Sequence, residues 1–148
     1  MNQPRRPDDA AAVRDIDHVA VVVRSIEASA HRYAELFGLR AGDTITLDTQ
    51  RVRLCFLGPP DGGAAIELIE PIDTDSGVGR FLADRGEGLH HVCFRTSDLE
   101  RDLARLVAAE AELIDREPRP GAEGDVAFVH PRTLNGVLWE LLERPPRR

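Results

Sequence analysis

Hydrophobic and polar positions in the first half of the chain follow a βαβββ order. Residues 15–23 are β-branched and apolar, which predicts a largely buried strand. Ser25 is a typical N-cap, apolar residues from Ile26 to Phe37 recur at helical spacing, and Gly38 is a typical C-cap. The pattern therefore predicts a helix over 26–37. Three further strands are predicted over 44–47, 52–57 and 65–70.

The same order restarts in the second half. Residues 89–96 predict a strand, and Ser97 or Asp98 is expected to cap a helix that carries Leu99, Leu103 and Leu106. Strands are predicted over 113–115, 126–130 and 137–142, with turn material at 118–121 and 131–136. A short amphipathic helix is predicted over 78–84, in the segment that joins the two halves.

The two halves superpose at a single offset of 73 residues. The matched pairs are His18 with His91, Ile26 with Leu99, Glu67 with Glu140, and Glu70 with Glu143. A unit of this length that occurs only twice predicts a pseudo-symmetric pair of modules. We expect a flexible tail over 1–14 and one α+β domain over 15–145, with module one at 15–71, a linker at 72–87 and module two at 88–145.

Each module contributes one histidine on its first strand and one glutamate on its last. If related strands meet around a pseudo-twofold axis, His18, Glu67, His91 and Glu140 converge as a mixed nitrogen and oxygen site for one divalent metal. Cobalt, manganese, nickel, zinc and iron all fit such ligands equally well. A solvent-facing carboxylate is the simplest explanation for either glutamate alone. Four possible ligands in register across one duplication favour the metal site.

The other histidines have weaker claims to the site. His90 alternates away from His91 along the strand, so the two are not expected to face the same site. His31 lies on the first predicted helix and is expected to be exposed. His130 ends a strand near a loop, where a ligand contact and a structural role are both open.

Composition limits the function classes. The 148 residues carry a formal charge of −7, which disfavours nucleic acid as a partner. All nineteen basic residues are arginine, so a lysine Schiff base is excluded and anions must be held by arginine, backbone amides or a metal. Cys55 and Cys93 are expected to be buried thiols, without a disulfide. No apolar run suits a membrane helix, and the expected location is cytoplasmic.

Several segments together resemble the vicinal oxygen chelate superfamily, which includes glyoxalase I, extradiol dioxygenases and bleomycin-resistance proteins. Within it the chain is most similar to the methylmalonyl-CoA epimerase family. The matching segments are IDHVA (16–20), IELIEP (66–71), GEGLHHV (86–92), EPR (117–119), HP (130–131) and GVLWEL (136–141).

The resemblance implies two βαβββ modules that form an open, cup-shaped sheet around one metal ion, with ligands at His18, Glu67, His91 and Glu140. It also implies a homodimer and an acyl-CoA substrate. The implied reaction interconverts (R)- and (S)-methylmalonyl-CoA by removal of the α-proton through a metal-stabilised enolate. Some epimerases have a glutamate, proposed as an acid/base residue, where this chain has Leu54.

Since Leu54 cannot transfer a proton, we assign the two acid/base roles to Glu67 and Glu140, which pseudo-symmetry would place on opposite faces of the substrate. Arg116, Arg119 and Arg132 are candidates for holding the CoA tail, with solvated surface arginines as the alternative. Other reactions remain open: a glyoxalase-type isomerisation, the epimerisation of another acyl-CoA, or metal-free binding of a small molecule.

Overall fold

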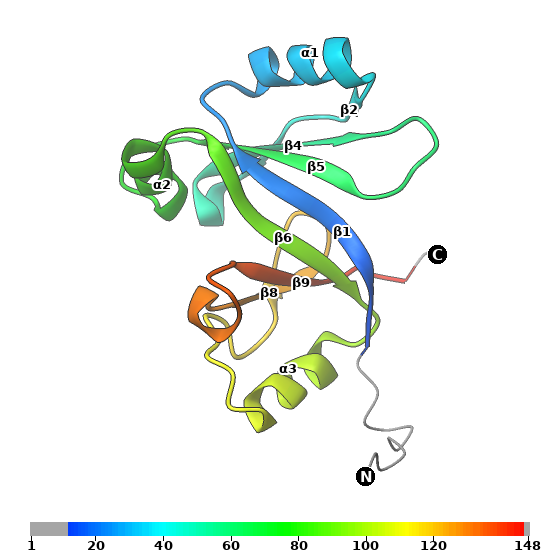
Figure 1. Cartoon of the computed structure of the whole chain (residues 1–148), viewed down its shortest axis with the longest axis vertical. Helices are drawn as coiled ribbons and strands as arrows, with labels where there is room; N and C mark the ends of the chain where they lie inside the picture. The colour runs from blue at the N-terminus through cyan, green and yellow to red at the C-terminus, as the bar shows by residue number, and fades with distance from the viewer. Residues whose placement is uncertain (1–11, 147–148) are drawn as a thin grey trace. The chain divides into compact units, whose positions relative to one another are not determined.

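The computed structural model describes residues 12–146, which fall into two compact units (Figure 1). One unit comprises residues 16–93, and the other comprises the described residues before 16 together with those from 94 onward. Most of the expected tail, residues 1–11, lies outside the described residues. The first strand, β1 (Val13–Val22), begins two residues before the expected position. The expected domain and linker boundaries stay a prediction.

The unit formed by residues 16–93 holds a mixed sheet. After β1 come α1 (Ile26–Phe37), β2 (Arg40–Ala41), β3 (Ile45–Leu47), the 3₁₀ turn η2 (Asp48–Gln50), β4 (Val52–Gly58), β5 (Ala65–Pro71), α2 (Gly77–Arg85) and β6 (Gly88–Thr96). The strand order is β2-β4-β5-β1-β6, and β3 also pairs with β4. β1 runs parallel to β5, whereas β4 runs antiparallel to it. The predicted βαβββ order is confirmed, with β2 as an unpredicted short strand.

The second unit contains α3 (Leu99–Ala108), β7 (Arg119–Pro120), β8 (Asp125–Val129), the 3₁₀ turn η3 (Pro131–Thr133) and β9 (Trp139–Glu143). β8 pairs antiparallel with both β7 and β9. The strand predicted over 113–115 is wrong, since only a single bridge joins Leu113 to Val129. The side chain of Asp115 accepts the N–H of Phe128 at 2.8 Å, which uses the donor that a longer strand would need.

A pair of equivalent glutamates caps the two main helices. Glu70 at the end of β5 accepts the Ile26 N–H at 2.9 Å, and Glu143 at the end of β9 accepts the Leu99 N–H at 2.8 Å. All four residues obey the 73-residue offset. A carboxylate at a helix N-terminus satisfies a free N–H group and is favoured by the helix dipole. The glutamate pair at 70 and 143 therefore has the same structural role in each unit.

The hydrophobic cores repeat at the same offset. Ile26, Leu57 and Leu68 pack in one unit, and Leu99, Leu103 and Leu141 pack in the other. Equivalent positions that recur in both clusters are Val21 and Phe94, Ala30 and Leu103, Tyr33 and Leu106, and Leu68 and Leu141. The buried face of α1 does not extend to the predicted end of the helix, since Phe37 is 70% exposed. Cys55 and Cys93 are buried and unbridged, as predicted.

None of the helices among residues 12–146 is long and apolar enough to cross a membrane. The longest described helix, α1, has 12 residues, and a spanning helix needs about 20. The expected cytoplasmic location stays a prediction.

Candidate metal centre

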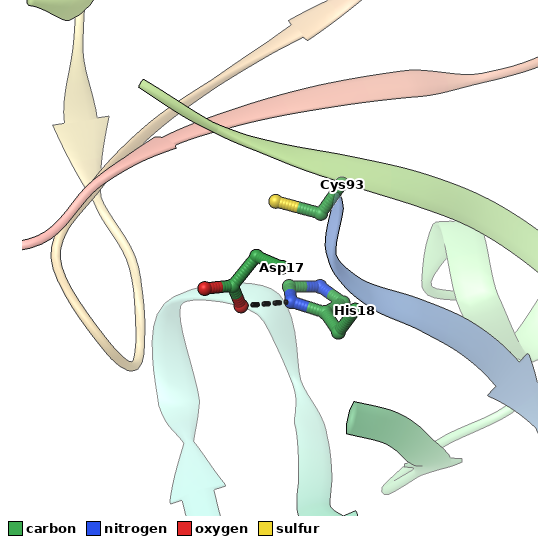
Figure 2. Close-up of side chains that lie close together, drawn as sticks. All are labelled: Asp17, His18 and Cys93. Atoms are coloured by element: carbon green, nitrogen blue, oxygen red, sulfur yellow. Dashed lines mark hydrogen bonds and ion pairs between the residues drawn. The ribbon is translucent and has the colours of Figure 1, made fainter. Parts of the chain in front are cut away.

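His18 is the central side chain of the candidate site. It lies on β1 and is only 2% exposed. Its Nδ1 atom lies 2.8 Å from Oδ1 of Asp17, the residue before it (Figure 2). The Asp17 side chain is 7% exposed, so this contact is shielded from solvent. A histidine held at Nδ1 presents its other nitrogen, Nε2, to whatever lies beyond the ring.

Glu67 lies beside His18 because of the register of two parallel strands. β1 and β5 pair His18 with Ala65 and Ala20 with Glu67. Residues two apart on a strand share a face, so His18 and Glu67 are diagonal neighbours on one face of the sheet. The Glu67 Oε2 atom lies 3.3 Å from His18 Nε2, and Glu67 is 6% exposed. Glu67 therefore does not face solvent.

His91 lies on β6 and is 3% exposed. Its ring centroid is 5.5 Å from that of His18, with the two rings nearly perpendicular. Burial lowers the pKa of His91 well below its ordinary value, and the neighbouring His90 and His18 lower it further. His91 is therefore neutral at pH 7, which is the form of histidine that binds a metal.

That His90 and His91 face different sites stays a prediction, but their rings are in contact. The two residues alternate along β6, yet His90 Nδ1 lies 2.8 Å from His91 Nδ1. The His90 ring packs edge-on against Phe81 of α2 at 5.1 Å, which turns it back towards its neighbour. Burial lowers the pKa of His90, and the charge of Arg85 lowers it further. Alternation describes the Cα–Cβ directions, whereas a long side chain can still reach the next ring.

Cys93 is a second neighbour that sequence reasoning did not assign to the site. Asp17, His18 and Cys93 each offer one possible ligand atom, and these atoms lie within 4.8 Å of one another (Figure 2). Cys93 is fully buried, two residues beyond His91 on the same strand. Cys93 could have been found from the sequence, because residues two apart on a strand share a face and Cys93 follows His91 by two.

Glu140 belongs to the unit that contains residues from 94 onward. It lies on β9, is 7% exposed and stands opposite Phe128 of β8. Its counterpart Glu67 stands opposite Phe56 of β4. Each glutamate is thus buried in the last strand of its module and faces an aromatic neighbour across the pair. A solvent-facing position is contradicted for both.

The three predicted arginines differ in their surroundings. Arg119 lies 3.1 Å from Asp115 and stacks over the Phe128 ring at 5.3 Å. Arg132 makes a two-pronged ion pair with Glu112, at 2.7 and 3.2 Å. Arg116 lines an 820 Å³ surface cavity between α3 and the segment that follows it. All three stay candidates for the CoA tail, and Arg119 and Arg132 already have carboxylate partners.

The remaining histidines and Leu54 have structural positions. His31 is exposed on α1, as predicted. His130 accepts the Arg132 N–H at 3.0 Å and so caps η3, which favours its structural role. Leu54 is buried on β4 between Ile45 and Ile69, where it can only contribute packing.

The donor set of residues 16–93 fits a divalent metal. Two ligand atoms bound to one ion at about 2.1 Å lie about 3.0 to 3.4 Å apart for right-angle to tetrahedral geometry. The 3.3 Å between His18 Nε2 and Glu67 Oε2 falls in that range. Buried imidazole and carboxylate ligands suit the borderline first-row metals and zinc.

Comparisons with known proteins show the family of this chain. Residues 17–128 match the model of the Glyoxalase/Bleomycin resistance protein/Dioxygenase superfamily. The uncharacterised protein YqjC of Bacillus subtilis is 40% identical over 129 residues, covering 86% of this chain and 91% of YqjC.

Two solved structures share the fold. Methylmalonyl-CoA epimerase from Mycobacterium tuberculosis is 31% identical with a TM-score of 0.87, covering 92% of this chain and 91% of that one. A variant of the Streptomyces coelicolor epimerase, in complex with 2-nitronate-propionyl-CoA, is 33% identical with a TM-score of 0.83, covering 90% and 99%. The glyoxalase-like α+β fold expected from the sequence is thus confirmed, and a structural relative binds an acyl-CoA.

Proposed function

Because this chain belongs to the Glyoxalase/Bleomycin resistance protein/Dioxygenase superfamily, we propose that it is a metal-dependent epimerase that interconverts (R)- and (S)-methylmalonyl-CoA. The observation that carries the proposal is the buried group of His18, Glu67 and His91. The similarity to methylmalonyl-CoA epimerases, at 31% and 33% identity, supports the choice of reaction.

The proposed ligands are His18, Glu67, His91 and Glu140. The first three are supported by burial and by their proximity within one unit. Glu140 is supported by its offset of 73 residues from Glu67 and by its burial on the equivalent strand. When bound, a divalent metal supplies Lewis-acid stabilisation for the negative charge that develops on a thioester oxygen.

The two glutamates transfer the proton. One carboxylate, assigned to Glu67, takes the α-proton, and the electron pair of the broken C–H bond is held in the enolate of the thioester. The other residue, Glu140, gives a proton to the opposite face as the carboxylic acid, which re-forms the C–H bond with inverted configuration. Loss of the proton from Glu67 to solvent and uptake of one proton by Glu140, or the reverse reaction, restores the starting state.

The same glutamates serve as ligands and as acid/base groups, so each exchanges one role for the other within a turnover. Leu54 supports this double use, because the strand position that carries an acid/base glutamate in some epimerases is here a buried apolar side chain. Glu67 is shielded from solvent and lies 3.3 Å from the His18 imidazole, a position from which it can contact a bound substrate.

Arg116, Arg119 and Arg132 are proposed to contact the phosphates of the CoA tail, as arginine is the only cationic side chain in this sequence. Arg116 lines an open cavity, but the carboxylates of five residues line it as well, so the cavity does not favour Arg116 over the other two arginines: Asp98, Glu100, Glu117, Asp125 and Glu143. A homodimer in the cytoplasm completes the proposal.

The test follows the α-proton directly. (S)-Methylmalonyl-CoA is incubated in D₂O with protein loaded with Co²⁺, and proton NMR records the loss of the α-proton signal with and without chelator. We expect chelator-sensitive exchange, and a 10²-fold or greater loss of exchange in Glu67→Gln and in Glu140→Gln. His31→Gln, on the exposed face of α1, is the matched control and keeps the wild-type rate.

The outcomes separate the alternatives. No metal-dependent loss of the α-proton signal would refute the epimerase. Exchange on ethylmalonyl-CoA but not methylmalonyl-CoA would assign a different acyl-CoA. Full exchange and unchanged metal content in both glutamate variants would show that the bases are assigned wrongly. Turnover of a glutathione hemithioacetal without any α-proton exchange would indicate a glyoxalase-type isomerase.

A further inference from the structure

Residues 17 and 90 immediately precede the two proposed histidine ligands. They are separated by the same 73 residues that separate His18 from His91. The sequence gives no reason to pair them, because one is an aspartate and the other a histidine. The structure shows that both side chains make the same contact with the residue that follows.

In each module, a side-chain atom of the first residue lies 2.8 Å from Nδ1 of the next. For Asp17 this atom is Oδ1, and for His90 it is Nδ1. Neighbouring residues on a regular strand point to opposite faces, so a contact of this kind is not a consequence of strand geometry. Its occurrence twice, at equivalent positions, indicates that the duplicated unit includes the support of the histidine as well as the histidine itself.

We propose that Asp17 and His90 are positioning residues that fix the tautomer and ring orientation of His18 and His91, so that Nε2 of each ring is the metal-binding atom. The proposal rests on the proposed metal site. A neutral imidazole carries its proton on one nitrogen and a lone pair on the other. A partner that accepts the Nδ1 proton therefore leaves the Nε2 lone pair for the ligand.

The hydrogen bond between His18 and Asp17 can run in only one direction. An ionised carboxylate only accepts hydrogen bonds, so His18 Nδ1 donates to Asp17. The Nε2 atom of the same ring lies 3.3 Å from Glu67 Oε2, on the side where the other proposed ligand of this strand pair lies. Carboxylate–histidine–metal arrangements of this form hold the ring and raise its basicity as a ligand.

We infer the direction of the hydrogen bond at His91 from the equivalent contact at His18. The two Nδ1 atoms lie 2.8 Å apart, so one donates and the other accepts. In the proposal His91 Nδ1 donates and His90 Nδ1 accepts, so His90 carries its own proton on Nε2. The His90 ring is held by Phe81, whose own ring lies 5.2 Å below the guanidinium carbon of Arg85. A neutral acceptor polarises His91 less than a carboxylate polarises His18. The two histidine ligands are therefore unequal, with His18 the stronger donor.

The experiment measures Co²⁺ affinity of the full-length protein by competition with a chromophoric chelator. Asp17→Ala and His90→Phe remove the acceptor, and we expect each to weaken Co²⁺ binding 10- to 100-fold. Asp17→Asn and His90→Asn keep an acceptor oxygen near the same position, and affinity is expected to return to within a few-fold of wild type. His31→Phe, on the surface of α1, is the matched control and leaves affinity unchanged.

A second readout reports the tautomer itself. Long-range ¹H–¹⁵N NMR of the Zn²⁺-loaded protein, labelled on histidine, distinguishes Nδ1–H from Nε2–H. We expect Nδ1–H for both His18 and His91. An Nε2–H tautomer for either ring overturns the proposal, as does wild-type Co²⁺ affinity in both Asp17→Ala and His90→Phe. A thiolate-to-cobalt charge-transfer band also overturns it, since Cys93 would then be a ligand.

Failure of the metal site and failure of the positioning role give different results. If His18→Ala and His91→Ala keep wild-type Co²⁺ affinity, the proposed function is wrong at its metal site. If those two variants lose Co²⁺ while Asp17→Ala and His90→Phe retain it, the metal site stands and the positioning role is wrong. The tautomer readout uses the wild-type protein, so the test stays decisive if Asp17→Ala or His90→Phe does not fold.

Discussion

Asp102 of α3 is the buried acidic residue that the duplication does not explain. It is 4% exposed, and the equivalent position in the first module is Ser29. Its Oδ1 accepts the Ala12 N–H at 2.9 Å, and its Oδ2 accepts the hydroxyl of Thr96 at 2.5 Å. Asp102 thereby ties the residues that lead into β1 to the start of α3.

Replacing Asp102 with alanine removes both acceptors and leaves the two donors buried. A hydrogen bond to a charged group contributes about 1.5 to 3 kcal/mol, and leaving a buried donor unsatisfied has a cost of similar size. Because the two bonds share one carboxylate, their losses are not fully additive. We expect Asp102→Ala to lower the free energy of unfolding by about 3 to 5 kcal/mol. Asp102→Asn keeps one acceptor and should lose about half as much.

Urea denaturation, followed by far-UV circular dichroism, measures both variants against Glu100→Gln. This exposed change removes a charge from the first turn of the same helix and should lie within about 1 kcal/mol of wild type. Thr96→Val completes a double-mutant cycle with Asp102→Ala, and we expect a coupling free energy of at least about 1 kcal/mol. A loss below about 1 kcal/mol in Asp102→Ala would refute the reasoning, since two charged hydrogen bonds cannot then be stabilising this residue.

Three further predictions concern the caps, a glycine and pH. Glu70→Gln and Glu143→Gln each keep an acceptor but remove the charge at a helix N-terminus, and each should lower the melting midpoint through a loss of about 1 kcal/mol; an unchanged midpoint in either would contradict the shared capping role. Gly124→Ala should cost about 2 kcal/mol or more in the same melts, because φ is 155° and a Cβ would meet the Glu143 carbonyl oxygen at 2.2 Å; wild-type stability would contradict this steric argument. Burial lowers the pKa of His90 and His91 below 6.5, so the unfolded chain binds protons there that the folded metal-free protein does not. Its free energy of unfolding should be at its plateau above pH 6.5 and fall below it, by up to about 1.4 kcal/mol per pH unit for each histidine; equal urea midpoints at pH 7.5 and 5.5 would disprove the link.

Much of the fold follows from local sequence. Apolar spacing and caps predicted α1 with its observed bounds, because helix ends depend on the nearby residues Ser25 and Gly38. The offset of 73 residues predicted a pair of related modules, and equivalent residues do recur in the two cores. Glu70 and Glu143, which the offset pairs, cap the two main helices. The strand expected over 113–115 failed because the side chain of Asp115 takes the hydrogen bond that extends a ladder, a competition that apolar periodicity does not report.

The candidate site also has one part that the sequence predicts and another part that only the tertiary structure decides. The sequence determined the two histidines and two glutamates, because a duplicated chain repeats residue types at a constant spacing. Only the tertiary structure decided that Asp17 and His90 each contact the next ring. Strand alternation sets the direction of each Cα–Cβ bond, but packing against a neighbour such as Phe81 selects where a ring ends up. Such packing joins α2 to β6, and a pattern read along one segment cannot contain it.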